Sequence, residues 1–186
     1  MTAPLRPDAE VTTQATLDLL VARARSAENE HAVRAVLDDP ELLLVGDSEH
    51  MARIYNPLCT ACTPVQDLAE LGAGVDLEGS AHVTVTSTDR MAPWMVLVYA
   101  LGARVSDLPG YLGNAVIAAS AVAETRRRVQ ETFDADRERI LERAQRFLTR
   151  PNNDPSHATE VLRALPEALD VALREERGVV TFGFSP

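Results

Sequence analysis

The residues with the most evident chemistry are two cysteines, spaced as Cys59-x-x-Cys62. Thr63, Pro64 and Gln66 follow them directly, and threonine, proline and glutamine at these positions form a capping-box pattern. We therefore expect a helix to begin at Pro64, with both thiols just before its first turn. Backbone N–H groups at a helix N-terminus stabilise a thiolate, so the pair would be redox-active there. Burial of two inert thiols is the commoner arrangement, and we favour it here.

A metal site is the second interpretation of the same residues. Its four ligands would be His50, Cys59, Cys62 and His82, and the metal would be zinc or iron. A single C-x-x-C supplies only half of a zinc knuckle, and the order His-Cys-Cys-His at these separations matches no standard finger. Glu28 and His31 share a helix face, but a di-iron site requires a second Glu-x-x-His motif, which the sequence lacks. The cofactor therefore stays unknown.

An enzymatic site is the third interpretation. A cysteine thiolate would be the nucleophile or redox centre, and His50 would be its general base. The candidate residues for such a site are Asp47, His50, Cys59, Cys62, Asp89 and Arg90. Asp89 and Arg90 precede an apolar segment with Trp94 and Tyr99, as polar groups do at the mouth of a small-molecule pocket. Other roles for these residues are commoner: Asp89 would cap a helix, Arg90 would form an ion pair, and Trp94 would lie in the core.

Charge and composition narrow the possible functions. The net charge is −10, and all 18 basic side chains are arginine. Without lysine, the chain cannot be a Walker-type nucleotide-binding protein, a Schiff-base enzyme or a Ser-Lys hydrolase. The negative charge argues against nucleic acid and anionic membrane surfaces as partners. The longest apolar stretch, residues 91–103, is too short to span a bilayer, and we expect a cytoplasmic protein.

Hydrophobic periodicity and turn residues predict the secondary structure. The first expected helix starts near Asp8, breaks at Ser26 and ends before Pro40, and the second starts near Asp47 and ends at Asn56-Pro57. A third helix is expected to start at Pro64 and a fourth to cover residues 107–148. The last one is expected after Pro155, with a kink at Pro166. The expected strands are residues 41–46, 82–86 and 179–184. Residues 95–101 fit either a buried helix or a buried strand, with helix slightly favoured.

These elements predict one domain, residues 1–186, with an α-rich α+β fold of about five or six helices around a small sheet. An all-α helical bundle is the alternative. The long amphipathic span and its alanine-rich part, residues 115–123, favour close approach of another helix or subunit. We therefore expect a cytoplasmic bacterial accessory protein that acts through an amphipathic helical surface, as a homo-oligomer or with a protein partner. The alternative is a small enzyme or metal or redox protein using Cys59, Cys62 and His50.

Overall fold

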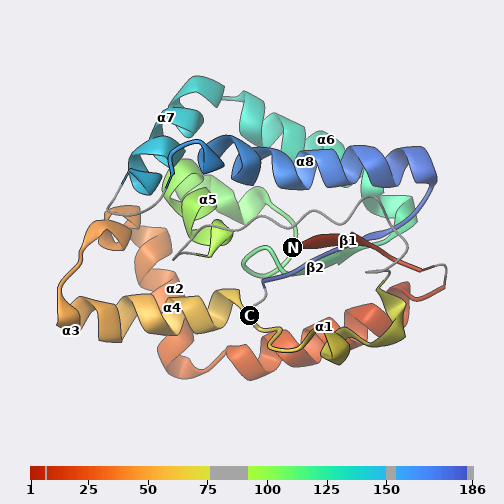
Figure 1. The fold of residues 1–186 in the computed structure, drawn as a ribbon, viewed down its shortest axis with the longest axis horizontal. Helices are drawn as coiled ribbons and strands as arrows, with labels where there is room; N and C mark the ends of the chain where they lie inside the picture. Colours follow the sequence, from red (N-terminus) through yellow and green to blue (C-terminus); the bar gives the residue numbers. More distant parts are fainter. Residues whose placement is uncertain (7, 76–91, 150–153, 184–186) are drawn as a thin grey trace.

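A computed structural model describes residues 1–6, 8–75, 92–149 and 154–183, and its fold is α-rich α+β (Figure 1). The α-helices are α1 (Glu10–Ala24), α2 (Ala27–Asp38), α3 (Ser48–His50), α4 (Asn56–Cys62), α5 (Pro93–Leu101), α6 (Val122–Asp134), α7 (Arg137–Leu148) and α8 (His157–Glu175). The 3-10 helices are η1 (Pro40–Leu44), η3 (Leu68–Gly74), η4 (Gly102–Asp107) and η5 (Ala119–Ala121), and η2 (Met51–Tyr55) is a π-helix. The strands are β1 (Thr2–Pro4), β2 (Ala115–Ile117) and β3 (Val179–Thr181).

The three strands form an antiparallel sheet in the order β1-β3-β2. In the register of the sheet, Val180 of β3 lies opposite Ala3 of β1 and Val116 of β2. The prediction of a C-terminal strand is confirmed for Val179–Thr181, because the β-branched run of β3 fits a pleated, buried surface, and residues 182 and 183 lie outside the strand. The sheet also makes the all-α bundle wrong.

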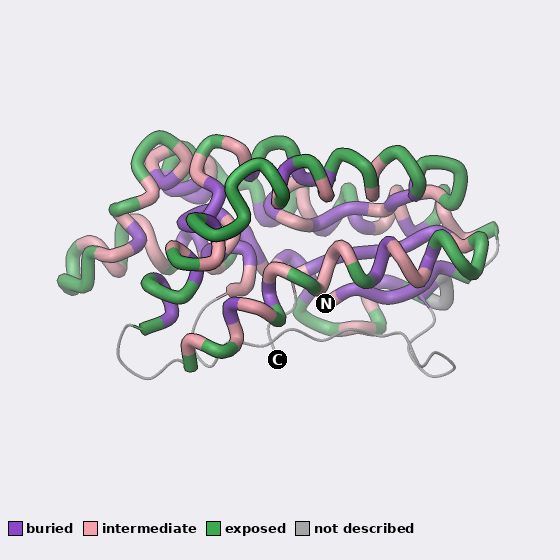
Figure 2. The backbone as a smooth tube through the Cα atoms, turned by 90° about the horizontal axis from the view of Figure 1, so that it is seen from above, coloured by how far each residue is buried: buried purple, intermediate pink, exposed green. Residues whose placement is uncertain are grey.

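The sheet is covered on both of its faces. Val179 packs in the same core cluster as Leu169 and Ala172 of α8, whereas Val180 packs with Leu17 and Leu20 of α1. Figure 1 shows the sheet between α8 and α1, and Figure 2 shows buried residues through the middle of the molecule with exposed residues on the outer turns of the helices. The alternation of side chains along β3 thus joins two hydrophobic clusters into one structure.

Helix α5 is the centre of the larger cluster, so residues 95–101 are helical as favoured. Most of its side chains are buried, as expected for a helix that is hydrophobic on all sides. The ring of Tyr99 stacks on Phe147 of α7 with 5.2 Å between ring centroids. The Arg143 guanidinium covers the same tyrosine at 4.7 Å from the ring centroid, and the Tyr99 hydroxyl donates to Glu41 at 3.0 Å. The tyrosine therefore buries its ring and keeps its polar group paired.

The strand predicted at residues 41–46 is wrong, since residues 40–44 form the 3-10 helix η1. Pro40 begins this turn, and the Asp39 carboxylate accepts a hydrogen bond from the backbone N–H of Glu41 at 3.1 Å. An acidic cap followed by proline favours a helical turn over a strand, whatever the apolar residues after it. The strand predicted at residues 82–86 lies outside the described residues.

The helix that begins after Asp47 does not end at Asn56-Pro57, as the sequence predicted. It continues through α3, η2 and α4 as one helical rod from Ser48 to Cys62. Proline inside a helix lacks a hydrogen-bond donor and its ring collides with a carbonyl of the preceding turn. The π-turn directly before Asn56, where the Asn56 N–H bonds to the Met51 carbonyl, widens the backbone at this point. The rod therefore accommodates Pro57.

The helix predicted over residues 107–148 is only partly correct. Its second part forms α6 and α7, but Ala115–Ile117 in the alanine-rich part is strand β2. Gly110 and Gly113 have φ angles of +78° and +81°, which a regular helix cannot contain, and the chain turns here. The predicted break at Ser26 is confirmed, since the Ser26 hydroxyl accepts from the Asn29 N–H, and α8 contains Pro166 as predicted.

Close packing at Gly183 gives a testable prediction for this fold. A Cβ atom at this position would overlap the backbone carbonyl of Cys62, which no side-chain rotation can relieve. We expect Gly183→Ala to lower the free energy of unfolding by about 1–3 kcal/mol, measured by urea denaturation. Gly46→Ala is the matched control, because nothing lies within 4 Å of its Cβ position, and it should leave the stability unchanged or slightly raised. Equal stability of both variants would contradict the packing of Gly183 on Cys62.

Candidate functional site

The two cysteines lie inside a helix, not in front of one. Both belong to α4, and Cys62 is its last residue. Thr63 does not cap a following helix, because its N–H and its hydroxyl both donate to the Cys59 carbonyl, at 3.1 and 2.8 Å. The helix predicted to start at Pro64 is therefore wrong. The capping box lies four residues later, at Asp67 and Glu70 of η3.

This position opposes thiolate formation. Burial raises the pKa of the Cys59 thiol to about 11, and burial together with the neighbouring charge at Cys59 raises the pKa of Cys62 well above its usual value. The carbonyl end of a helix carries partial negative charge, which disfavours an anion further. A helix N-terminus, as expected from the sequence, would stabilise a thiolate, whereas these surroundings keep both cysteines as neutral thiols at pH 7.

Both thiols are free. Residues three apart on a helix have Cβ atoms about 5–6 Å apart, whereas a disulfide needs about 3.5–4.5 Å. A bond between Cys59 and Cys62 would therefore require the last turn of α4 to unwind. The carbonyl of Cys62 packs against Gly183, so this turn is held in place by the segment that follows β3.

His50 does not lie where a general base for these thiols must be. It precedes Cys59 by nine residues on the same helical rod, a separation of roughly 13 Å along the axis at 1.5 Å per residue. It lines a surface hollow of about 320 Å³ with Leu42, Asp47, Glu49, Arg53 and Ile54. Asp47 is occupied as a helix cap, accepting from the His50 N–H at 2.8 Å. The His50 Nε2 atom is buried and has no hydrogen-bond partner among the described residues.

The predicted metal site also lacks assembled ligands. Among the residues that the structure describes, no three His, Cys, Asp or Glu side chains lie together as a metal would require. His82, Asp89 and Arg90 lie outside the described residues, so the structure places neither the fourth metal ligand nor the last two catalytic candidates. Trp94 and Tyr99, named with them, are both buried in the core around α5.

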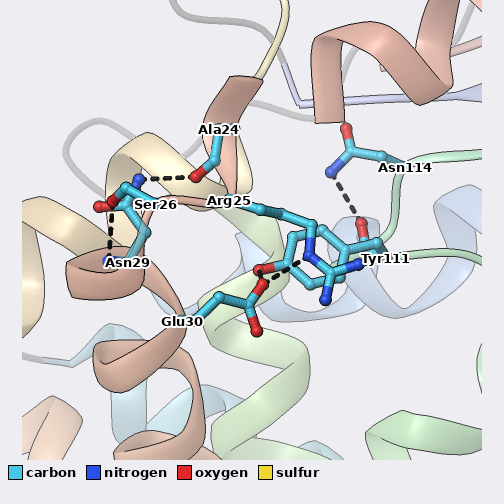
Figure 3. A network of polar contacts seen from close by, with 7 residues as sticks. All are labelled: Ala24, Arg25, Ser26, Asn29, Glu30, Tyr111 and Asn114. Atoms are coloured by element: carbon cyan, nitrogen blue, oxygen red, sulfur yellow. Dashed lines mark hydrogen bonds and ion pairs between the residues drawn. The ribbon is translucent and has the colours of Figure 1, made fainter. Parts of the chain in front are cut away.

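A polar cluster that sequence reasoning missed links the corner between α1 and α2 to the 110–114 turn (Figure 3). Arg25 binds Glu30 at 2.6 Å and covers the Tyr111 ring at 4.7 Å from its centroid. The Tyr111 hydroxyl donates to Glu30 at 2.7 Å. The hydrogen bond from Tyr111 lowers the pKa of the Glu30 carboxyl the most, and the hydrogen bond from Arg25 has the next largest effect. The sequence predicted the break at Ser26, but nothing local indicates a partner 81 residues away.

Asn114 extends this cluster to the end of the sheet. Its side-chain nitrogen donates to the Tyr111 carbonyl at 2.9 Å, and its side-chain oxygen accepts from the Gly183 N–H at 2.8 Å. The Thr181 hydroxyl donates to the Gly113 carbonyl beside it. These hydrogen bonds connect the α1–α2 corner, the 110–114 turn and the end of β3, so the cluster holds three segments together.

The outer face of α1 is a second feature that the sequence analysis did not single out. Val11, Ala15, Leu19 and Ala22 are all exposed and fall within about 80° of arc on the helix. Val11 and Leu19 are 82% and 70% exposed, more than any other large hydrophobic side chain in the described part of the chain. The buried residues of α1, Thr13, Leu17, Leu20 and Ala24, lie on the opposite side. We call the four exposed apolar residues the α1 outer face.

Comparison with known proteins adds no assignment. No protein-family model, no curated protein and no solved structure matches the chain. Among the described residues, no helix is both long and apolar enough to cross a membrane.

The pKa of Cys59 predicts slow thiol chemistry. With a pKa of about 11 in place of 9.0, its thiolate fraction near neutral pH is about 100-fold lower than that of an ordinary thiol. Alkylation by iodoacetamide, followed by mass spectrometry, should be slow at pH 7.5 and accelerate up to about pH 11, with Cys62 slower still. In urea both residues should react at the ordinary rate. Rapid alkylation of the folded protein at pH 7.5 would contradict this environment.

The same pKa shift predicts a loss of stability in base. The unfolded chain ionises Cys59 near pH 9.0, whereas the folded protein keeps it neutral up to about pH 11. The unfolded state therefore binds fewer protons in this range, and the free energy of unfolding falls as the pH rises. Cys59→Ser in the reduced protein should flatten this part of the profile, measured as urea midpoints between pH 8 and 11. An unchanged slope would refute the assignment to Cys59.

A pH-dependent contribution is also expected from the Tyr111–Glu30 hydrogen bond. Tyr111→Phe should cost about 0.5–1.5 kcal/mol at pH 7, measured by urea denaturation. Because the folded protein lowers the pKa of Glu30, this stabilisation is present above the ordinary value of 4.5 and is lost as the pH falls through the lowered value. The stabilities of the variant and the wild type should therefore converge in acid. A constant difference at all pH values would contradict a bond to the carboxylate.

Proposed function

We propose that the protein is a non-catalytic interaction protein that docks a protein partner on the α1 outer face. The observation that carries this proposal is the row of exposed apolar side chains along α1. Helices at the surface of a folded protein place polar residues toward the solvent, and contiguous exposed apolar patches mark sites of association. Burial of a valine and a leucine side chain in a complex stabilises it by about 1.5–3 kcal/mol each.

Helices α6 and α7 differ from α1 in this respect. The outer side of α6 is charged, and Arg127 lies between Glu124 and Glu131 with contacts of 2.6 and 2.5 Å. The outer side of α7 carries Arg137, Glu138, Arg139 and Glu142 among its exposed residues. Such paired charges suit a solvated surface. Although the sequence favoured residues 107–148 as the interaction surface, this contrast supports α1 instead.

The surroundings of the thiols support a non-catalytic role. Raised pKa values make Cys59 and Cys62 poor nucleophiles at pH 7, and the separation from His50 leaves them without this base. We also propose a cytoplasmic location, which the two free thiols support because reducing compartments preserve them.

Site-specific photo-crosslinking in the native cells tests this proposal. A benzophenone amino acid at Thr12, an exposed residue beside the α1 outer face, should yield a discrete protein adduct, and Leu19→Asp in the same chain should abolish it. The matched control is the same amino acid at Glu167, an exposed position of α8, which should give none. Equal labelling at both positions, or no adduct at Thr12, would overturn the proposal. The mass of the adduct tells whether the partner is a second copy or another protein.

A further inference from the structure

The end of α4 carries two free thiols, and its backbone packs on the segment that follows β3. We propose that Cys59 and Cys62 form a thiol–disulfide switch: oxidation by a small-molecule disulfide, such as oxidised glutathione, joins the two sulfurs and releases Gly183 from the end of α4. The two cysteines lie three positions apart in the last turn of the helix, and so on one face of it. The intact turn keeps them too far apart for a disulfide, so the bond forms only when this turn unwinds.

Two sets of contacts hold this turn closed. The Thr63 N–H and hydroxyl both donate to the Cys59 carbonyl, at 3.1 and 2.8 Å. The Cys62 carbonyl packs so closely on Gly183 that a Cβ atom at Gly183 would overlap it. Unwinding of the turn breaks the hydrogen bonds to Cys59 and moves the Cys62 carbonyl away from Gly183. The contact between α4 and the segment after β3 therefore requires the closed turn.

Gly183 connects this turn to two further segments. Its carbonyl accepts a hydrogen bond from the Val65 N–H at 3.4 Å, and its N–H donates to the Asn114 side chain at 2.8 Å. The Asn114 side chain also binds the Tyr111 carbonyl, at 2.9 Å, as part of the polar cluster in Figure 3. Loss of the packing on Cys62 frees Gly183 to move, so oxidation weakens both of its hydrogen bonds.

The position of the pair favours local opening over global unfolding. Cys62 is the last residue of α4, and helix ends open at a lower free-energy cost than helix centres. Pro64 lacks a backbone N–H, so it adds no hydrogen bond to this turn. Burial in the closed turn raises the pKa values of both thiols and protects them from reaction. Opening exposes them to water and removes this protection.

The coupling between the turn and the disulfide acts in both directions. Because the closed turn disfavours the disulfide, the disulfide disfavours the closed turn by the same free energy. The reduced chain therefore holds Gly183 on α4, whereas the oxidised chain keeps the two apart. Reduced glutathione, which breaks the disulfide by the reverse exchange, closes the turn again.

The reaction consists of two thiol–disulfide exchanges. Cys59, the less buried of the two, loses its proton to water on opening, and its thiolate attacks one sulfur of oxidised glutathione. The S–S bond of glutathione breaks, and one glutathione thiolate leaves and takes up a proton. The Cys62 thiolate, formed in the same way, then attacks the Cys59 sulfur and expels the second glutathione as a thiolate, which is also protonated. Two electrons thus pass from the two cysteines to one molecule of oxidised glutathione.

Amide hydrogen exchange of the full chain, followed by NMR before and after oxidation with excess oxidised glutathione, tests the inference. Mass spectrometry should show the loss of two hydrogen atoms and no bound glutathione. The amides of Val65 and Gly183 should then exchange about tenfold faster or more, the factor that corresponds to one or two lost hydrogen bonds. The amide of Val180, in the centre of the sheet, should keep its rate.

Cys59→Ser is the matched control for the exchange experiment. It leaves Cys62 without a partner, so the oxidant should not change the exchange at Gly183. If the folded chain forms no disulfide under conditions in which the urea-unfolded chain does, the pair is only structural and the inference fails. Unchanged exchange at Gly183 in the oxidised chain, or equally accelerated exchange at Val180, would also overturn it.

The rate of disulfide formation tests the role of Gly183 separately. Gly183→Ala should accelerate the reaction about tenfold, because it disrupts the packing that keeps the turn closed. Ile140→Val is the control, because it weakens the core at α7 and leaves the contact between Cys62 and Gly183 intact. Its rate should stay near that of the wild type. No acceleration by Gly183→Ala, or equal acceleration by both substitutions, would contradict oxidation through local opening at Gly183.

Discussion

Burial of β3 on both faces is the constraint on which the rest of the structure depends. The strand is central in the sheet, and its successive side chains enter two different hydrophobic clusters. A sheet of three short strands is not stable in water unless helices cover it. Helix α8 covers the side of Val179, and α1 covers the side of Val180. The inner face of α1 is thereby fixed against the sheet, and its opposite face is directed to the solvent.

The same packing explains why the thiols are inert. After β3 the chain passes directly over the end of α4, where Gly183 touches the Cys62 carbonyl and accepts a hydrogen bond from the Val65 N–H at 3.4 Å. The end of α4 must therefore be buried beneath this segment. Cys62 is enclosed and Cys59 half enclosed, and burial raises both pKa values. A motif that suggests redox chemistry in the sequence is here part of the contact between a helix end and the C-terminal strand.

The parts of the fold that the sequence predicted are those determined by local interactions. The Ser26 hydroxyl caps α2 by accepting a hydrogen bond from the N–H of Asn29, three residues later. The apolar run of α5 is buried as a helix, and the β-branched residues of β3 form a strand. The missed strands, β1 and β2, are only three residues long and contain Ala3, Pro4 and Ala115, and they exist because β3 pairs with them. Pairing between residues so distant in the chain leaves no periodic signal. The Tyr111–Glu30 contact escaped prediction for the same reason.

Thr63-Pro64 shows a different limit, in which two local signals compete. Threonine before proline favours the start of a helix, but the threonine hydroxyl can equally well donate to a carbonyl in the last turn of α4. In the structure Thr63 donates to that carbonyl, so it ends α4 and starts no new helix.

Helix α1 carries two apolar stripes. The stripe of Leu17 and Leu20 suffices to cover the sheet, and the stripe of Val11 and Leu19 contributes nothing to the core. Folding requires only one of them. The second costs solvation free energy in the isolated chain, and burial against another surface removes that cost.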